Sequence, residues 1–380
     1  MSKTLIYADH AATTPLSEAA LAAMQPYMKT EFGNPSTLYS LSRKPRKAVS
    51  DARESIAAAI GALPEEIYFT SGGTEADNWA LTGTAFHGIG RKAHFITSAI
   101  EHHAVLNTCA FLERIGCEVS YLPVDRQGIV RPQCLEEKLR AHTALVSVML
   151  ANNEIGTVEP IAELSAVAHA HGALFHTDAV QAVGHIPIDV ARLGVDMLSA
   201  SAHKFNGPRG VGFLYVRKGT ALEPLIHGGA QENRMRAGTE NVAGIVGMAA
   251  ALREHVETLE ADARRLESLR GLLLARLREA PLDFVVNGGD AHIPGSLSLS
   301  FRGMSGEALL HRLDLMGIAV ATGSACDSRE TVLSHVVRAI GVEPEYAEGT
   351  IRVTLGSDND EGQILQIASA LGKICPARWK

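Results

Sequence analysis

The sequence predicts an α/β protein with a mostly parallel sheet, followed by a smaller α+β region. Up to Gly238, short apolar segments bounded by turns alternate with amphipathic stretches of helical length. Strands in such an alternation are buried on both faces by the intervening helices, so they appear as apolar runs. After Gly238 the pattern changes to one long helical stretch and then to shorter mixed segments, which is typical of an α+β unit.

The elements of the first region follow in order along the chain. Thr14 as N-cap and Pro15 at the first helical position predict a helix that ends or kinks near Pro26. A second helix is expected over residues 42–60, closed by Gly61. The alternation then predicts strands at residues 66–70, 94–97, 117–122, 145–150, 174–177, 197–199 and 211–216, with helices at 75–86, 104–115, 135–140 and 161–171.

The second region begins with a long helix. Residues 241–279 are rich in Ala, Leu, Glu and Arg and carry no proline, as expected for one continuous helix. The remaining segments predict strands at residues 284–286, 296–301, 318–321 and 351–355, and helices at 307–316 and 361–371. We expect the boundary between the two regions to lie inside the long helix.

The composition excludes several classes of protein. The chain has 380 residues, 46% of them hydrophobic and 20% charged, which is typical of a soluble globular protein. A net charge of −7 without a large basic block argues against a nucleic-acid partner. No apolar run reaches about 18 residues, so no membrane span is expected. The five cysteines are odd in number and form no C-x-x-C pair, which favours the reducing cytoplasm over a disulfide framework or a zinc site.

One lysine deserves separate consideration. Lys204 follows the small and polar run Ser199–Ala202 and precedes the turn Gly207-Pro208. A lysine in this place is either a solvated loop cation or an amine held in a pocket for Schiff-base chemistry. Its position alone favours the solvated cation, because lysine side chains are rarely buried.

A glycine turn lies between a predicted strand and a predicted helix. Ser71-Gly72-Gly73-Thr74 can bind phosphate through backbone N–H groups, the helix dipole and the Thr74 hydroxyl. It lacks the Gly-Lys-Ser/Thr ending of a P-loop. A plain tight turn explains the same residues equally well.

Two further sites carry titratable groups at strand ends. Asp178 follows a predicted strand, where it can pair with a protonated ring nitrogen of a ligand or cap the segment 179–183, and Gln181 can reach the same ligand. His102, in Glu101-His102-His103, can stack on a ring and transfer protons, or belong to a solvated pair. No third metal ligand lies at a recognisable spacing, so we expect no metal.

Taken together in this order, these motifs resemble a known family. The glycine turn, Glu101-His102, Asn152–Gly156, Asp178–Gln181 and Ser201–Lys204 are similar to fold-type I pyridoxal-phosphate enzymes, and more narrowly to cysteine desulfurases of the NifS/IscS type in the class V aminotransferase family. The resemblance extends from Asp9 to Arg352. It implies a large domain at residues 15–255 with a mostly parallel seven-stranded sheet. It also implies a small domain, formed by residues 1–14 and 256–380, that carries a catalytic cysteine loop.

The resemblance implies a role for each matching residue at the cofactor. Lys204 would hold pyridoxal 5'-phosphate covalently and act as the base. Asp178 would pair with the ring nitrogen, and Gln181 would bond to the phenolic oxygen. His102 would stack on the ring and exchange a proton with the substrate thiol. The remaining cofactor ligands would be Gly73, Thr74, Ser201 and His203 around the phosphate, Asn152 in the pocket beside ring and substrate, and Thr239 from the other subunit of a homodimer.

Two residues in the second region would define the reaction. Cys326 lies in a loop of small residues, where an exposed thiolate can attack another sulfur and carry it away. The other cysteines are expected to be small packing residues. Arg352 would clamp the substrate carboxylate with its planar fork, although without the resemblance an exposed strand arginine is the default.

The resemblance implies a cysteine desulfurase that converts L-cysteine to L-alanine and leaves a persulfide on Cys326. The sulfur would pass to an acceptor protein, either an iron–sulfur scaffold or a sulfur carrier. A selenocysteine lyase, an aminotransferase of the same fold and a non-catalytic sulfur-transfer scaffold remain as alternatives. Two departures from the family pattern stand out. Residues 37–40, including Tyr39, lack a histidine common there, and Asp327 replaces a common threonine beside Cys326, where its charge can raise the thiol pKa.

Overall fold

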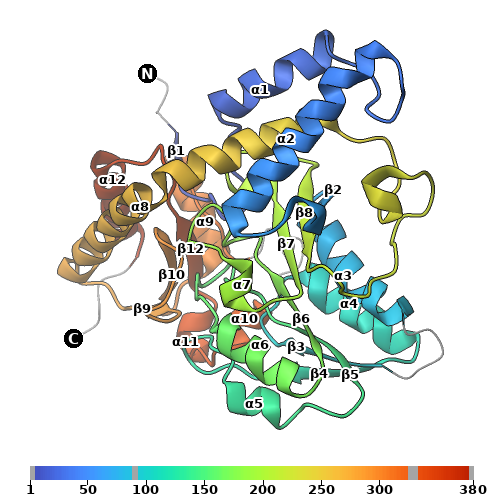
Figure 1. Cartoon of the computed structure of the whole chain (residues 1–380). Helices are drawn as coiled ribbons and strands as arrows, with labels where there is room; N and C mark the ends of the chain where they lie inside the picture. Colours follow the sequence, from blue (N-terminus) through green and yellow to red (C-terminus); the bar gives the residue numbers. More distant parts are fainter. Residues whose placement is uncertain (1–4, 88–92, 324–332, 376–380) are drawn as a thin grey trace.

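The structure is a computed structural model that describes residues 5–87, 93–323 and 333–375 (Figure 1). Its largest sheet has seven strands, and every neighbouring pair in it is parallel except the two pairs that involve β8. This arrangement confirms the predicted mostly parallel sheet. Across the sheet the strands are Ile67–Thr70 (β2), Gly212–Val216 (β8), Met197–Ser201 (β7), Leu174–Asp178 (β6), Thr143–Ser147 (β5), His94–Ser98 (β3) and Glu118–Leu122 (β4).

Helices cover both faces of this sheet, as the apolar strands require. Successive residues of one strand point to opposite faces, so in β5 Leu145 packs with one helical layer and Val146 with the other. One layer contains Gly73–His87 (α3) and His103–Arg114 (α4). The other contains Glu18–Lys29 (α1), Arg43–Ile60 (α2), Pro132–Glu136 (α5), Ile161–Ala170 (α6), Val190–Leu193 (α7) and the first part of Val242–Glu279 (α8).

A second hydrophobic core lies beside the large sheet. It is built on a three-stranded antiparallel sheet in the order β12-β10-β9 and a two-stranded parallel sheet of β1 and β11. The strands are Ile6–Tyr7 (β1), Phe284–Asn287 (β9), Ser296–Phe301 (β10), Ile318–Ala319 (β11) and Thr350–Thr354 (β12). The helices of this region are Gly306–Leu315 (α9), Pro344–Ala347 (α11) and Glu361–Ile374 (α12). Helix His335–Ala339 (α10) instead packs in a small separate cluster with Ile100 and Ile155.

The 38-residue helix α8 contributes to both cores. Its buried side chains up to Leu252 pack against the large sheet, whereas those from Leu266 onward pack in the second core. Figure 1 shows α8 running from the large sheet to α12. Like the other helices in the described ranges, α8 is not apolar enough to cross a membrane.

The first predicted helix begins later than expected. Its N-cap is Ser17, whose hydroxyl accepts from the Ala20 N–H, and Pro26 lies inside the helix without ending it. Thr14 has a different partner, because its hydroxyl donates to the carbonyl of His203. The helix expected at residues 135–140 is α5, which begins at Pro132 because proline favours the first helical position. Elements β1, α7, α10 and α11 were not predicted.

Candidate active site

A cavity of about 440 Å³ opens where the parallel strands of the large sheet end. The loops that follow β2, β3, β5, β6 and β7 all contribute to it, because carboxyl ends of parallel strands meet at one edge of a sheet. The described residues that line it include eight predicted site residues, namely Gly73, Thr74, His102, Asp178, Gln181, Ser201, His203 and Lys204, together with Arg352 from β12. Residues predicted from separate motifs therefore share one cavity.

Lys204 ends a short 3₁₀ turn, Ala202–Lys204, directly after β7. Its amine Nζ lies 2.6 Å from the carbonyl oxygen of Ala11 and 2.9 Å from that of Ala12. Both carbonyls belong to the segment near the start of the chain that lines the cavity. The amine therefore points into the cavity region and is held there by backbone acceptors, instead of extending into solvent as a loop cation.

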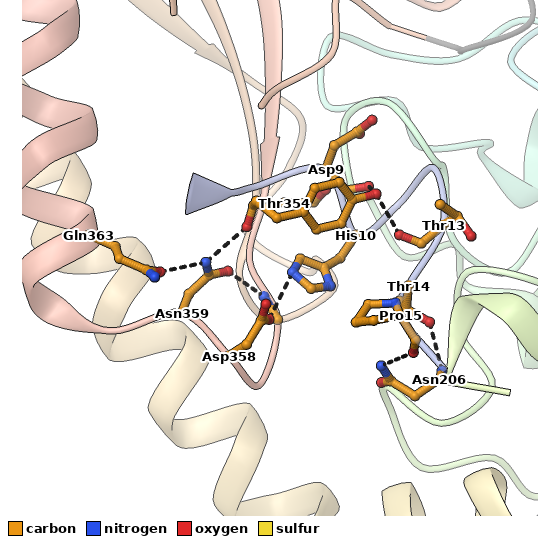
Figure 2. Close-up of polar contacts among 12 residues, drawn as sticks. Asp9, His10, Thr13, Thr14, Pro15, Asn206, Thr354, Asp358, Asn359 and Gln363 are labelled. Carbon is orange, nitrogen blue, oxygen red and sulfur yellow. Dashed lines mark hydrogen bonds and ion pairs between the residues drawn. The ribbon is translucent and has the colours of Figure 1, made fainter. Parts of the chain in front are cut away.

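The segment that holds Lys204 is tied to both cores. Figure 2 shows His10 turned toward Asp358, with Nε2 and Oδ1 3.1 Å apart, on the side of the second core. On the other side, the Asn206 N–H donates to the Thr14 hydroxyl at 2.7 Å and the Asn206 amide donates to the Pro15 carbonyl (Figure 2). This double attachment positions the acceptors of Lys204.

Three buried or half-buried acid–base groups converge inside the cavity. One ligand-type atom each of Asp77, His102 and Asp178 lies within 4.8 Å of the others. Burial raises the pKa of Asp178, an effect opposed by His102, by the Val180 N–H that donates to Oδ1 and by Lys204. Burial lowers the pKa of His102 and so favours its neutral ring. The Ala104 N–H donates to His102 Nδ1, so the proton of the neutral ring is on Nε2.

Asp77 was not predicted as a site residue. It lies one turn after Thr74 on α3, where its spacing resembles that of any buried helix residue. Burial, and then the charge of Asp178, raise the pKa of Asp77 well above its usual value. Its neighbour His176 is fully buried and lies 3.7 Å from Asp77 Oδ1. Burial lowers the pKa of His176 to about 3, so this ring is neutral and provides no counter-charge.

The glycine turn closes one side of the cavity. A Cβ atom on Gly73 would lie 2.5 Å from Val180 Cγ2, so a larger residue would not fit where the glycine turn meets the segment after Asp178. Helix α3 begins at Gly73, and the N–H groups in the first turn of a helix have no partner within that helix. The turn thus has the donors and the close approach expected of a phosphate site.

The residues predicted around this turn make specific contacts. His203 Nδ1 lies 3.2 Å from the Thr13 hydroxyl, and burial, with Lys204 and Arg209 nearby, lowers the pKa of His203 to about 4. The Gln181 amide donates to the Ala11 carbonyl, the same oxygen that accepts from Lys204. Arg209 also lines the cavity and was not predicted.

Glu75 lines the cavity one residue beyond the glycine turn. Its carboxylate accepts from the Ser71 N–H at 2.8 Å and from Arg236 at two positions, at 2.8 and 3.1 Å. Arg236 belongs to the segment 231–239, which also contains Thr239. Thr239 is exposed and borders, with Arg236, a neighbouring cavity of about 200 Å³, and neither of these two residues lines the main cavity. The Glu75–Arg236 pair could not be predicted, because the two residues are 161 positions apart.

Arg352 reaches the cavity from the second core with only 2% of its surface exposed. Its Nη2 donates to Asp9 Oδ1 at 2.6 Å, and its Nη1 donates to the carbonyl of Asn153 at 2.7 Å. Its Nε is buried without a hydrogen-bond partner in the described chain. The two hydrogen bonds hold the guanidinium in a fixed orientation at the wall of the cavity.

Asn152 occupies a different place from the one expected. The cavity is lined by Asn153, whereas Asn152 is buried behind the wall. The Asn152 amide nitrogen donates to the Ile100 carbonyl, and its Oδ1 accepts from the N–H groups of Glu154 and Ile155. These bonds fold the turn that presents the Asn153 carbonyl to Arg352.

Cys326 and Asp327 lie outside the residues that the structure describes. The nearest described residues on either side include Gly323 and Ser334. The Ser334 hydroxyl donates to Glu154 Oε2 at 2.6 Å, and a Cβ atom on Gly323 would lie 3.1 Å from that same oxygen. Tyr39, the other departure from the family pattern, is 52% exposed.

Comparisons with known proteins cover nearly the whole chain. A family model described as aminotransferase class-V matches residues 6–367. A curated protein of Dictyoglomus turgidum named cysteine desulfurase IscS is 52% identical, over 93% of this chain and 90% of that relative. A protein of Methanosarcina thermophila with the same name is 46% identical, over 97% and 91% of the two chains.

Solved structures give the same result. A structure described as a NifS-like protein superposes with a TM-score of 0.92 at 38% identity and covers 98% of this chain and 99% of its own. A second, described as SspA in complex with cysteine, has a TM-score of 0.83 at 39% identity and covers 92% of this chain and 98% of its own.

Proposed function

We propose that the cavity binds pyridoxal 5'-phosphate on Lys204, because the chain belongs to the aminotransferase class-V family and is a cysteine desulfurase of the NifS/IscS type. We further propose that it moves sulfur from L-cysteine to Cys326. The observation that carries this proposal is the meeting of Lys204, Asp178 and His102 in one cavity beside the glycine turn.

The residues of the cavity fit the proposed cofactor. A volume of about 440 Å³ is typical of small-molecule sites. Asp178 is a buried carboxylate suited to a protonated ring nitrogen, and Lys204 provides the amine. The N–H groups of Gly73 and Thr74 at the start of α3 suit a phosphate, with Ser201 and His203 beside them. Because the Lys204 amine lies in the same cavity, we prefer this cofactor over a metal for the Asp77, His102 and Asp178 cluster.

The protein residues then have separate tasks. When bound, pyridoxal phosphate supplies an electron sink for an amino acid attached to it. Lys204 Nζ, held by the Ala11 and Ala12 carbonyls, moves the proton at the substrate α-carbon. Neutral His102, with its proton on Nε2, exchanges a proton with the substrate sulfur.

The substrate end of the site combines a cation with the loop thiol. Arg352, oriented by Asp9 and the Asn153 carbonyl, binds the carboxylate of L-cysteine. The Cys326 thiolate attacks the substrate sulfur, so that an S–S bond forms as the C–S bond breaks. The electron pair of the C–S bond stays with the substrate β-carbon, which takes up a proton, and L-alanine is released. An acceptor protein, an iron–sulfur scaffold or a sulfur carrier, then takes the sulfur from this persulfide.

The test measures alanine and protein-bound sulfur. We expect Lys204→Ala to lose the visible absorbance of the lysine-bound cofactor and all alanine formation. Cys326→Ala should keep the absorbance and bind L-cysteine but form no protein-bound persulfide. Lys218→Ala, which changes an exposed lysine paired with Glu65, and Cys134→Ala serve as matched controls.

The same assay separates the alternatives. Persulfide that persists on Cys326→Ala would show that another thiol is the nucleophile. An aminotransferase would yield a keto acid instead of alanine, and a selenocysteine lyase would retain activity toward selenocysteine in Cys326→Ala. A silent scaffold would form no product from either amino acid.

We also propose a homodimer in the cytoplasm. Large apolar side chains on α1 and the segment after it are exposed, including Met28, Phe32 and Leu38, and such a cluster favours a protein interface. Thr239 is exposed in the segment 231–239, from which it would reach the phosphate of the other subunit. Sedimentation velocity should give a mass twice that of one chain. The double variant Phe32→Glu, Leu38→Glu should have the mass of a single chain.

The low cysteine content supports a reducing compartment.

A further inference from the structure

The pair formed by Glu75 and Arg236 is half-hidden beside the phosphate end of the proposed site. The two side chains are 10% and 20% exposed, and the guanidinium makes two hydrogen bonds to the carboxylate. Burial alone would raise the pKa of Glu75, but hydrogen bonds from Arg236 and Ser71 offset it and lower the pKa below its usual value. Glu75 is therefore ionised at neutral pH.

An ionised carboxylate at this place opposes the proposed cofactor. Glu75 lines the main cavity in the first turn of α3, where the N–H groups of Gly73 and Thr74 would hold the phosphate. A phosphate dianion and a carboxylate repel each other, and the repulsion is strong in a partly buried site. Arg236 lies on the far side of Glu75, so its charge is placed to cancel that of the carboxylate.

Arg236 is delivered by a segment with an unusual backbone. Three successive residues, Glu232, Asn233 and Arg234, have φ angles of 44°, 56° and 69°, in the left-handed region that non-glycine residues rarely adopt. Such strain persists only where other contacts determine the conformation. Here the buried Glu232 carboxylate is held by Arg53 at 2.6 Å and by the Phe69 N–H at 2.9 Å. The segment thus holds Arg236 in a fixed position at the glycine turn.

We propose that Arg236 is a charge-compensating positioning residue of the cofactor site: by pairing with Glu75 it allows the glycine turn to accept the phosphate of pyridoxal phosphate. The proposal rests on the cofactor assignment made above. It gives the segment 231–239 two tasks, since Arg236 would serve the phosphate of its own subunit while Thr239, three residues later, reaches that of the other.

The test is the affinity of the full-length protein for two ligands that differ by the phosphate. Equilibrium dialysis against pyridoxal phosphate and against pyridoxal, which lacks the phosphate, gives both dissociation constants. We expect Arg236→Met to raise the constant for pyridoxal phosphate about tenfold and to leave that for pyridoxal within about twofold. In the double variant with Glu75→Gln, the affinity for pyridoxal phosphate should return to within about threefold of wild type.

Control variants separate charge compensation from damage to the segment. Arg234→Met removes an exposed positive charge two residues away and should leave both constants unchanged. Arg236→Lys keeps the positive charge but lacks the planar fork, so its dissociation constant for pyridoxal phosphate should lie between those of wild type and Arg236→Met. If Arg236→Met does not fold, Arg236→Lys provides the test in its place.

Three results would overturn the proposal: unchanged affinity for pyridoxal phosphate in Arg236→Met, equal loss for both ligands, or no recovery in the double variant. A wild-type protein that binds neither ligand would instead contradict the cofactor assignment itself.

Discussion

Two arginine–carboxylate pairs border the cavity, and they face it in opposite order. Arg352 lines the cavity, and Asp9 lies behind it. Glu75 lines the cavity, and Arg236 lies behind it. In both pairs the rear partner comes from a distant part of the sequence, and in both it uses a direct hydrogen bond to fix the residue in front.

The difference between the pairs follows from what each end would bind. A substrate carboxylate needs a cation facing it, so the proposed role of Arg352 requires the front position that this residue occupies. A phosphate at the glycine turn would be held by backbone N–H groups and the helix dipole, so the position that Glu75 occupies does not require a cation. The residue in front therefore faces the ligand, and the residue behind it holds the front residue in place. Substitutions at the front and rear positions should accordingly differ in their effects on ligand binding.

The largest effect is expected at the front residue Arg352. Arg352→Lys keeps the charge but loses the fork that contacts both Asp9 and the substrate, so we expect kcat/KM for L-cysteine to fall about thirtyfold, or about 2 kcal/mol. Visible absorbance of the bound cofactor should be unchanged. The spectral change on binding cysteamine, which lacks the carboxylate, should be the same in variant and wild type. Equal loss for both amines would contradict the assignment of Arg352 to the carboxylate.

Unlike the two paired acids, one buried acid has no counter-charge among the residues that the structure describes. Glu101 is fully buried, accepts from Ser98 and the Met149 N–H, and its Oε2 has no hydrogen-bond partner in the described chain. Burial raises the pKa of Glu101 to about 8. Between its unfolded pKa near 4.5 and the folded pKa near 8, the folded state holds a proton that the unfolded state has lost. The free energy of unfolding therefore decreases as the pH rises through this range.

Glu101→Gln removes this dependence while keeping the shape of the side chain. We expect wild type to lose about 3 kcal/mol more stability than Glu101→Gln between pH 5.5 and pH 8. Urea unfolding at the two pH values measures the difference. Glu159, whose pKa burial also raises to about 8, contributes equally to both proteins and cancels. Parallel pH curves for the two proteins would show that Glu101 is already ionised when folded.

The smallest effect is expected at the rear residue of the substrate end. Asp9→Asn keeps an oxygen acceptor for Arg352 Nη2 but removes the charge, so we expect KM for L-cysteine to rise about threefold at unchanged kcat. Asp358→Asn, which changes the partner of His10 instead, is the matched control. A fall in kcat with unchanged KM would mean that Asp9 acts in the chemical step and not in orienting the clamp.

The fold was largely predictable because its signals are local. Apolar runs, the glycine at position 61 and the long helix before Glu279 each depend on neighbours within one element. The first helix was misplaced because Thr14 and Ser17 are both good caps, and Thr14 has a partner in His203 that only the folded chain brings near. The two-residue strand β1 has too little sequence to carry a pattern.

The meeting of Lys204, Asp178 and His102 in one cavity was predictable, because each of them follows a strand and lies within a family motif. The rear partners were not, because Asp9 and Arg352 are 343 positions apart and no local pattern links them. Asp77 was missed for a related reason, since its spacing on α3 is that of an ordinary core position. Asn153 lines the cavity where Asn152 was expected, and which of the two residues does so depends on the orientation of one turn.

The segment after β1 has a consequence for the order in which the protein is made. Ile6 pairs with Ile318, and the Ala11 N–H donates to the hydroxyl of Thr354, 343 positions further on. A chain synthesised from its amino end folds its large sheet while these partners are still unmade. The segment with the two carbonyls that hold the Lys204 amine is therefore anchored on both sides only after the ribosome has passed β12, because Asn206 holds just its later end. The catalytic pocket is completed last during translation, and a ribosome that stalls before β12 would leave a nascent chain with a finished sheet and an unfinished active site.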